Sequence, residues 1–290
     1  MVRRPVLFAF VVAALLTPAS PAGAGARTQK LPRADGLRFA HGQVRDRVLA
    51  SPVRAVQAAL TGWGGTYTTA SGEHVTVYSS FSYPVDNARN QAWADFLAGL
   101  VHGSELSRVR VYFAPLAEVA QSCGDEADGC YFPTTQQLVV IGEDDQYATV
   151  EEVLTHEYGH HVAYNRSNAP WAAVAWGAKR WASYENVCAR RAAGTAFPGD
   201  EGANYLRNPG ESFAESFLQL NEARAGTERT PWFYDDEFRP DDAALAALEQ
   251  DVTQPWSAPA ATTFAETARA PQTVAVIRLG EEANRLPFAS

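Results

Sequence analysis

The sequence predicts an α+β domain with a mixed sheet beside a histidine-rich helix, followed by a mainly helical C-terminal part. Three observations support this fold class. Strand-like apolar patterns occur over residues 66–80, 108–115 and 136–144. A helical segment with three histidines, VEEVLTHEYGHHVAYN, follows the last of these strands. Helical periodicity then dominates up to residue 252, and strands followed by helices are typical of an α+β domain.

The chain is long enough for a substantial core and carries an acidic excess. Its 290 residues, 46% of them hydrophobic, suit one large domain or two smaller ones. The formal charge is -9, and no dense Lys/Arg cluster occurs after the first four residues. We therefore expect no nucleic acid partner and no stable membrane association.

The N-terminus has the features of a secretory signal peptide. MVRR is a positive start, PVLFAFVVAALL is an apolar run, and small residues follow with A-x-A at residues 22–24 and 24–26. The apolar run is shorter than the ~20 residues of a membrane span. We expect a signal peptide over residues 1–26 and a secreted, extracellular protein. Removal of the signal peptide takes away Arg3 and Arg4, so the expected formal charge of the mature chain is -11.

Three further regions follow the signal peptide. Residues 27–64 form an N-terminal arm, which is either a pro-segment or an integral part of the domain. Residues 65–250 form the principal domain. Residues 251–290 form a C-terminal tail, which is rich in proline and contains one strand-like run, TVAVIRL.

The elements before the histidine helix follow from periodicity and turn residues. Residues 66–80 read as two strands around Ser71 and Gly72, and residues 86–103 have helical spacing. Pro115 ends the next strand, and a polar cluster ends the strand 136–144.

Capping residues define the helices that follow. Thr149 and Glu152 form a T-x-x-E capping box in front of the histidine helix. Asn208 at the N-cap and Pro209 at the first helical position open another helix, NPGESFAESFLQLNEARAG. Further helical stretches are expected over 171–194 and 241–252, with a loop over 197–207.

Cysteine usage agrees with export. Cys123 and Cys130 bracket a polar loop, SCGDEADGC, and we expect them to form a local disulfide in an oxidising compartment. Cys188 is then left over, either buried or reactive. The loop aspartates lack the alternating spacing of a calcium site, so calcium is not expected there.

The histidine helix predicts a metal site with a catalytic base. His156 and His160 are four residues apart and point to one side of the helix, where two imidazoles can bind one zinc ion. Glu157 lies beside this pair, in position to take a proton from an attacking water. The remaining histidines are poor ligand candidates because of their distance or direction: His41, His74, His102 and His161.

A catalytic zinc needs a third protein ligand. The longer pattern HExxHxxGxxH is excluded, since Ala163 and Arg166 occupy its later positions. Glu211 is the better candidate, and Glu215, one turn later, is placed to accept a hydrogen bond from a ligand histidine. Two alternatives stay open: Glu211 is only a capping carboxylate, and Glu215 is only solvated. The fallback ligands are Asp200, Glu201 and Glu185.

HEYGH followed downstream by ESFAE resembles the gluzincin branch of zinc metallopeptidases, which includes thermolysin-like and anthrax lethal-factor-type enzymes. The resemblance covers about residues 130–220 and implies a zincin-like fold with one catalytic Zn²⁺. It implies His156, His160 and Glu211 as zinc ligands, Glu157 as general base and Glu215 as the histidine's partner. Fifty residues separate His160 from Glu211, a longer gap than in thermolysin, so the intervening helices are not carried over.

The resemblance also implies two features of substrate binding. The strand QLVVIGE, before the active-site helix, would pair with an extended substrate backbone; the alternative is an ordinary core strand. Tyr205 is the candidate phenol that stabilises the oxyanion, and the alternative is a packed loop tyrosine.

These observations together predict a secreted zinc peptidase that acts on a peptide or protein substrate. Two alternatives remain: a zinc hydrolase specific for cell-wall peptides, and a non-catalytic secreted binding protein that contains zinc.

Overall fold

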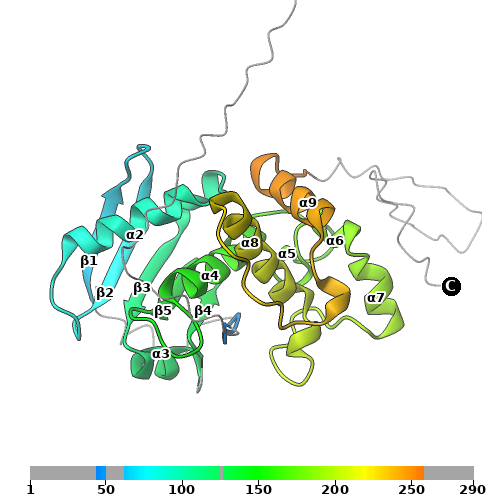
Figure 1. The fold of residues 1–290 in the computed structure, drawn as a ribbon, viewed down its shortest axis with the longest axis horizontal. Helices are drawn as coiled ribbons and strands as arrows, with labels where there is room; N and C mark the ends of the chain where they lie inside the picture. The colour runs from blue at the N-terminus through cyan, green and yellow to red at the C-terminus, as the bar shows by residue number, and fades with distance from the viewer. Residues whose placement is uncertain (1–43, 50–61, 125–126, 258–290) are drawn as a thin grey trace, which may run out of the picture.

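The computed structural model describes residues 44–49, 62–124 and 127–257 (Figure 1). The predicted signal peptide, the strand-like run TVAVIRL and His41 lie outside these residues, as does most of the predicted N-terminal arm. In the described part the fold is α+β with a mixed five-stranded sheet, which confirms the predicted fold class at that level.

The sheet has the strand order β1-β2-β3-β5-β4. Its strands are β1 (Gly62–Thr68), β2 (His74–Ser80), β3 (Arg110–Ala114), β4 (Gly129–Phe132) and β5 (Gln137–Ile141). The three central strands β2, β3 and β5 are parallel, and each edge strand is antiparallel to its neighbour. β5 is therefore an interior strand, and the edge near the histidine helix is β4.

Helices cover the sheet and form the second half of the domain. They are α2 (Asn87–Gly99), α3 (Leu116–Cys123), α4 (Val150–Tyr164), α5 (Ala173–Trp176), α6 (Lys179–Tyr184), α7 (Val187–Ala193), α8 (Pro209–Ala225) and α9 (Asp242–Thr253), with short 3₁₀ turns at Ser104–Arg108, Tyr205–Arg207 and Asp236–Phe238. Figure 1 shows the sheet and α2 on one side and the shorter helices on the other, with α4 beside α8 between them.

The capping box predicted for α4 is present. The Thr149 hydroxyl accepts a hydrogen bond from the Glu152 backbone N–H, and the Glu152 carboxylate accepts one from the Thr149 backbone N–H at 2.7 Å. Because these bonds satisfy backbone donors that a helix start leaves open, α4 can begin inside the protein. Val153, Leu154 and Tyr158 are fully buried; Val153 lies against Gly129 of β4, and Tyr158 packs on Phe217 of α8.

Helices α4 and α8 pack closely because small residues face each other. A Cβ atom added at Gly159 would lie 2.8 Å from the Cα atom of Ala214, closer than real Cβ contacts occur. The helix that carries the histidines therefore comes near the helix that carries Glu211 only because position 159 has no side chain.

The structure contains two elements that the sequence did not predict. α3 lies inside a stretch that carried no assignment, and β4 is only four residues long. All four residues of β4 are buried, so its sequence GCYF lacks the alternation that marks a half-exposed strand. The expected helical region 171–194 is divided into three short helices. Gly177 and Asn186, at the breaks between them, have positive φ angles, which interrupt a right-handed helix.

The predicted disulfide is present between Cys123, the last residue of α3, and Cys130 in β4. The two cysteines are seven positions apart in the sequence, and their bond links α3 to β4. Cys188 is half-buried and takes no part in this disulfide.

A short part of the predicted N-terminal arm packs into the domain. Residues 44–49, called here the 44–49 segment, run parallel to β4 and form a bridge between Val48 and Tyr131. Val44 is a buried member of the hydrophobic core. Strand β1 begins at Gly62, and the 44–49 segment packs against β4; both lie before residue 65, where the principal domain was expected to start.

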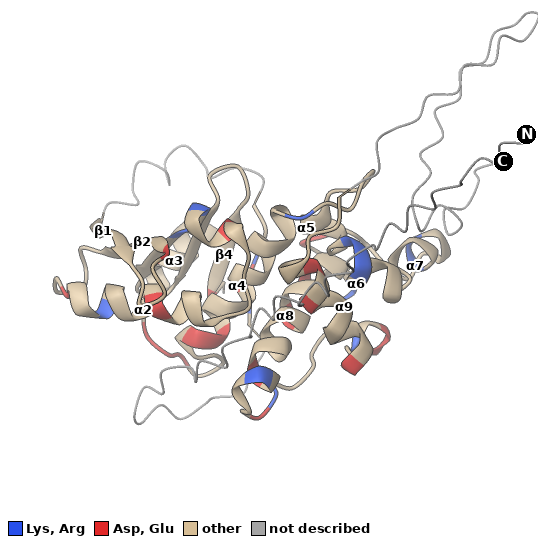
Figure 2. Cartoon of the chain, turned by 90° about the horizontal axis from the view of Figure 1, so that it is seen from above, with Lys and Arg blue, Asp and Glu red and all other residues tan. Residues whose placement is uncertain are grey.

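The described surface carries charges of both signs. Figure 2 shows Lys and Arg on separate elements rather than along one face, with Asp and Glu interspersed. Among the described helices, none combines the length and the apolar character that crossing a membrane requires.

We predict that Gly159→Ala lowers the free energy of unfolding by about 1–3 kcal/mol, the usual cost of overpacking, because the added methyl group forces α4 and α8 apart. Urea denaturation in the presence of a chelator measures this effect. Gly65→Ala is the matched control, since nothing lies within 4 Å of a Cβ atom added there. Equal stability of the two variants would contradict the close contact.

Candidate metal centre

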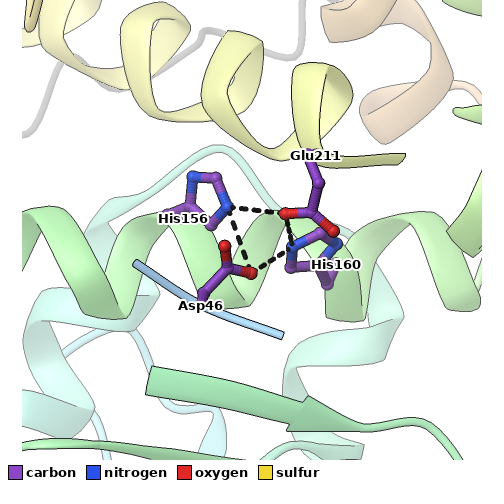
Figure 3. A group of neighbouring side chains, drawn as sticks. All are labelled: Asp46, His156, His160 and Glu211. Carbon is purple, nitrogen blue, oxygen red and sulfur yellow. Dashed lines mark hydrogen bonds and ion pairs between the residues drawn. The ribbon is translucent and has the colours of Figure 1, made fainter. Parts of the chain in front are cut away.

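Three separate parts of the chain bring four potential ligands together. α4 contributes His156 and His160, α8 contributes Glu211, and the 44–49 segment contributes Asp46 (Figure 3). One nitrogen or oxygen atom from each side chain lies within 4.8 Å of all the others. Figure 3 shows all four side chains converging on one point between the two helices and the segment.

The spacing of these atoms suits a tetrahedral metal ion. Ligands at 2.0–2.2 Å from a tetrahedral zinc are about 3.3–3.6 Å apart. Nε2 of His156 lies 3.5 Å from both Asp46 Oδ2 and Glu211 Oε2. Nε2 of His160 lies 3.0 Å and 3.2 Å from the same two oxygens. The four side chains therefore already stand close to the separations that one shared ion requires.

Unpaired polar atoms support the same interpretation. The side chains of all four residues are fully buried. Nε2 of His156 and Oε2 of Glu211 make no hydrogen bond within the described residues, although both point into the cluster. Buried polar atoms that make no hydrogen bond are costly, and a cation among the four side chains would satisfy both.

The carboxylates create a negative electrostatic environment around the two histidines. Burial alone lowers the pKa of His160, but Glu211 and Asp46 raise it to about 10. His156 behaves in the same way: burial lowers its pKa, and the Asp46, Glu211 and Glu215 carboxylates raise it well above the ordinary value. Burial raises the pKa of Asp46, but the two histidines hold it well below the usual range. The chain has thus gathered carboxylates that attract a positive charge.

Glu215 orients the first histidine. Its Oε2 lies 2.9 Å from Nδ1 of His156, the contact that the sequence predicts. Because a carboxylate accepts the proton on Nδ1, the lone pair of Nε2 is left to face the cluster. Glu215 is almost completely buried, so the alternative of a solvated side chain does not describe it.

Asn208 connects the start of α8 to the ligand on it. Its side-chain oxygen accepts hydrogen bonds from the backbone N–H groups of Gly210 and Gly199. Its amide nitrogen donates to Glu211 Oε1 at 3.4 Å and to Glu201 Oε1 at 3.1 Å. Glu211 therefore holds one oxygen against Asn208 and presents the other to the cluster, instead of capping the helix.

Glu157 lies beside the cluster with both carboxylate oxygens unpaired among the described residues. Burial and the neighbouring Asp46 carboxylate raise its pKa well above the ordinary value, while His160 and His156 act in the opposite direction. A Cβ atom added at Gly129 would lie 2.5 Å from Glu157 Oε1, so only glycine in β4 leaves room for this carboxylate. No described side chain therefore competes for the two oxygens of Glu157.

Two tyrosines close the other side of the site. The Tyr205 hydroxyl donates a hydrogen bond to Asp46 Oδ1 and lies 3.2 Å from the Tyr234 hydroxyl. Burial and the Asp46 charge raise the pKa of Tyr205 well above 10, so this phenol stays protonated and can donate. Tyr234 also stacks on the ring of His156, with 6.3 Å between ring centroids.

The remaining candidates do not join the cluster. Glu201 is the nearest: its Oε2 accepts the Val48 N–H at 3.3 Å, and burial together with Glu211 raises its pKa to about 9. Asp200 accepts hydrogen bonds from its own loop, and Glu185 is buried elsewhere. His161 is a core histidine bound to the Tyr131 hydroxyl at 3.1 Å.

Sequence reasoning missed Asp46 and Tyr234. Asp46 lies 114 positions before His160 in the segment RDRVL, which has no metal-ligand spacing. Tyr234 follows two further aromatic residues in WFY, which reads as a packed loop. No local pattern marks either residue, because each reaches the site only through the packing of distant segments.

No model of a known protein family matches the chain, and no curated protein resembles it significantly. The geometry of the site must therefore support any functional conclusion.

We predict that Glu211→Ala lowers zinc affinity by at least the ~100-fold that loss of an outer partner of a ligand can cause, because a ligand oxygen is removed. Competition against a chromophoric chelator measures the affinity. Glu201→Gln is the control, since glutamine has nearly the same shape as glutamate and Glu201 is not one of the four potential ligands. This variant should leave the zinc affinity nearly unchanged. A Glu211 variant that binds zinc normally would move the ligand assignment to Glu201 or Asp200.

Proposed function

We propose that this protein is a secreted zinc-dependent peptidase with a zincin-like fold, similar to the gluzincins. One observation carries the proposal: Glu157, buried and without hydrogen-bond partners among the described residues, lies directly beside a cluster of two histidines and a glutamate. A structural metal site needs no such base, whereas hydrolysis of an amide does.

The residues fit a division of roles. His156, His160 and Glu211 would hold the zinc ion, and Glu215 keeps His156 in the tautomer that binds metal. A zinc ion bound there supplies a Lewis acid that polarises a peptide carbonyl and makes water more acidic.

Glu157 would accept the proton of the attacking water and pass it to the amine that leaves. Its burial keeps competing water away from the carboxylate and raises its pKa, which favours holding the proton between the two steps. The Tyr205 hydroxyl, a protonated donor in the same site, would donate to the oxygen on which negative charge develops.

The proposed location rests on two features. The first 26 residues have the pattern of a signal peptide, and the Cys123–Cys130 disulfide is of the kind that persists outside the cytosol. A cell-wall peptide contains the same type of amide bond and could be hydrolysed by the same residues.

A second candidate function is favoured by the count of ligands. Asp46 makes the cluster a set of four protein side chains, and a metal site closed by four protein ligands is typical of structural zinc. In that case the protein would be a secreted zinc-containing binding protein. The unpaired Glu157 carboxylate is not explained by this alternative.

We predict that Glu157→Gln retains zinc and loses peptide cleavage by about 10²–10⁴-fold, because the amide cannot accept the proton. Digestion of a diverse peptide library, read by mass spectrometry with and without a chelator, measures this. The test uses both the native chain and an Asp46→Ala background, since Asp46 occupies the site in the native chain.

Chelator-sensitive cleavage that disappears in the Glu157 variant supports the peptidase. Zinc-loaded protein that cleaves no peptide in either background favours the binding protein instead. Normal cleavage by the Glu157 variant would contradict the assigned base.

A further inference from the structure

We propose that the 44–49 segment is a displaceable internal inhibitor of the site, with Asp46 as a fourth ligand that keeps the metal closed. The chain is therefore latent until this segment moves, and the edge of β4 with which the segment pairs is the edge at which an extended peptide substrate would pair. The identity of the substrate rests on the proposed function; the blocking of the metal by Asp46 does not.

The segment binds as an extra strand at the edge of the sheet. The Tyr131 backbone N–H donates to the Arg47 carbonyl at 3.0 Å, and the Leu49 N–H donates to the Tyr131 carbonyl at 2.9 Å. The Asp128 N–H donates to the Arg45 carbonyl at 2.6 Å. Backbone hydrogen bonds of this type bind any extended peptide and depend little on its side chains, so an added strand can be exchanged for another.

The Asp46 carboxylate stands where the reacting groups of a substrate would meet the site. Its Oδ2 faces the two ligand histidines, and its Oδ1 accepts the hydrogen bond of the Tyr205 hydroxyl. One carboxylate thus faces both ligand histidines and the Tyr205 hydroxyl at once. It takes the position that a water and a substrate carbonyl would need.

One group of contacts that holds the segment lies at Arg45, outside the site. Arg45 forms a two-bond contact with Asp128, at 2.7 Å and 3.1 Å, and a second ion pair with Asp145 at 3.2 Å. Its guanidinium also lies 4.3 Å from the centre of the Tyr147 ring. The Arg45 side chain is 31% exposed, so these contacts are accessible from solvent. Docking can therefore be weakened without altering any ligand.

These contacts distinguish a displaceable segment from a permanent ligand. Three of the four ligands lie on two capped helices that pack against each other, and they move only if the core opens. Asp46 lies on a short segment. Edge hydrogen bonds, the partly exposed Arg45 and one buried side chain, Val44, hold this segment in place. The fourth ligand is the one that can leave while the other three stay.

The experiment uses the full-length chain loaded with Co²⁺, whose visible spectrum reports the number and exchange of ligands, and acetohydroxamate as a small probe that binds an open metal position. Spectral titration gives the probe affinity for the native chain, Asp46→Ala and Arg45→Ala. The matched controls are Arg224→Ala and Glu249→Ala, a partly exposed ion pair between the last turn of α8 and α9. Peptide-library cleavage by the zinc form of each variant is measured in parallel.

We expect the native chain to bind the probe at least 100-fold more weakly than Asp46→Ala, with Arg45→Ala between them and both controls like the native chain. Arg45→Ala keeps every ligand, so its effect reports displacement alone. Probe binding as tight in the native chain as in Asp46→Ala would overturn the inhibitory role. An opened site in Asp46→Ala with no effect of Arg45→Ala would make Asp46 a permanent ligand.

The cleavage measurement separates this inference from the proposed function. A site that opens in both variants but cleaves no peptide would leave the displaceable ligand standing and remove the peptidase. Cleavage by the native chain equal to that of Asp46→Ala would support the peptidase and remove the latency.

Discussion

The burial of charge at one point is the constraint on which the rest of this structure depends. Four almost completely buried carboxylates gather with two histidines at the site: Asp46, Glu157, Glu211 and Glu215. Isolated charges buried in this way cost several kcal/mol each unless they are paired or bind a metal. The raised pKa values of both histidines follow from the surrounding negative charge. A divalent cation is the partner that would balance this arrangement.

The scaffold holds this charge by fixing two helices in close contact. α4 begins at a complete capping box and α8 at an asparagine cap followed by proline, so each helix starts at a defined residue. Gly159 against Ala214 then allows the two axes to approach. Gly129 does the same for β4 beside Glu157. Small residues at these contacts matter because the ligands are short and cannot bridge a wider gap.

Asp46 links the metal centre to the edge of the sheet. In the structure the same segment completes the ligand set, pairs with β4 and hydrogen-bonds through Val48 to Glu201. A metal with four protein ligands has no open position for water, whereas a general base is useful only where the metal has an open position. A permanent site would therefore not need both. They are compatible when the fourth ligand lies on a segment that can be exchanged for substrate.

The sequence by itself determined the elements whose signals are local. The T-x-x-E box, the spacing of His156 and His160, and the Asn-Pro start of α8 each lie within a few residues, and helix geometry converts them directly into position. The pairing of Cys123 with Cys130 is local in the same sense. Only the tertiary structure decided that Asp46 joins the histidines and that β5 is interior while the four-residue β4 forms the edge. These contacts join segments far apart in the chain, and their energy comes from shared burial and edge hydrogen bonds, which leave no periodic mark in the sequence.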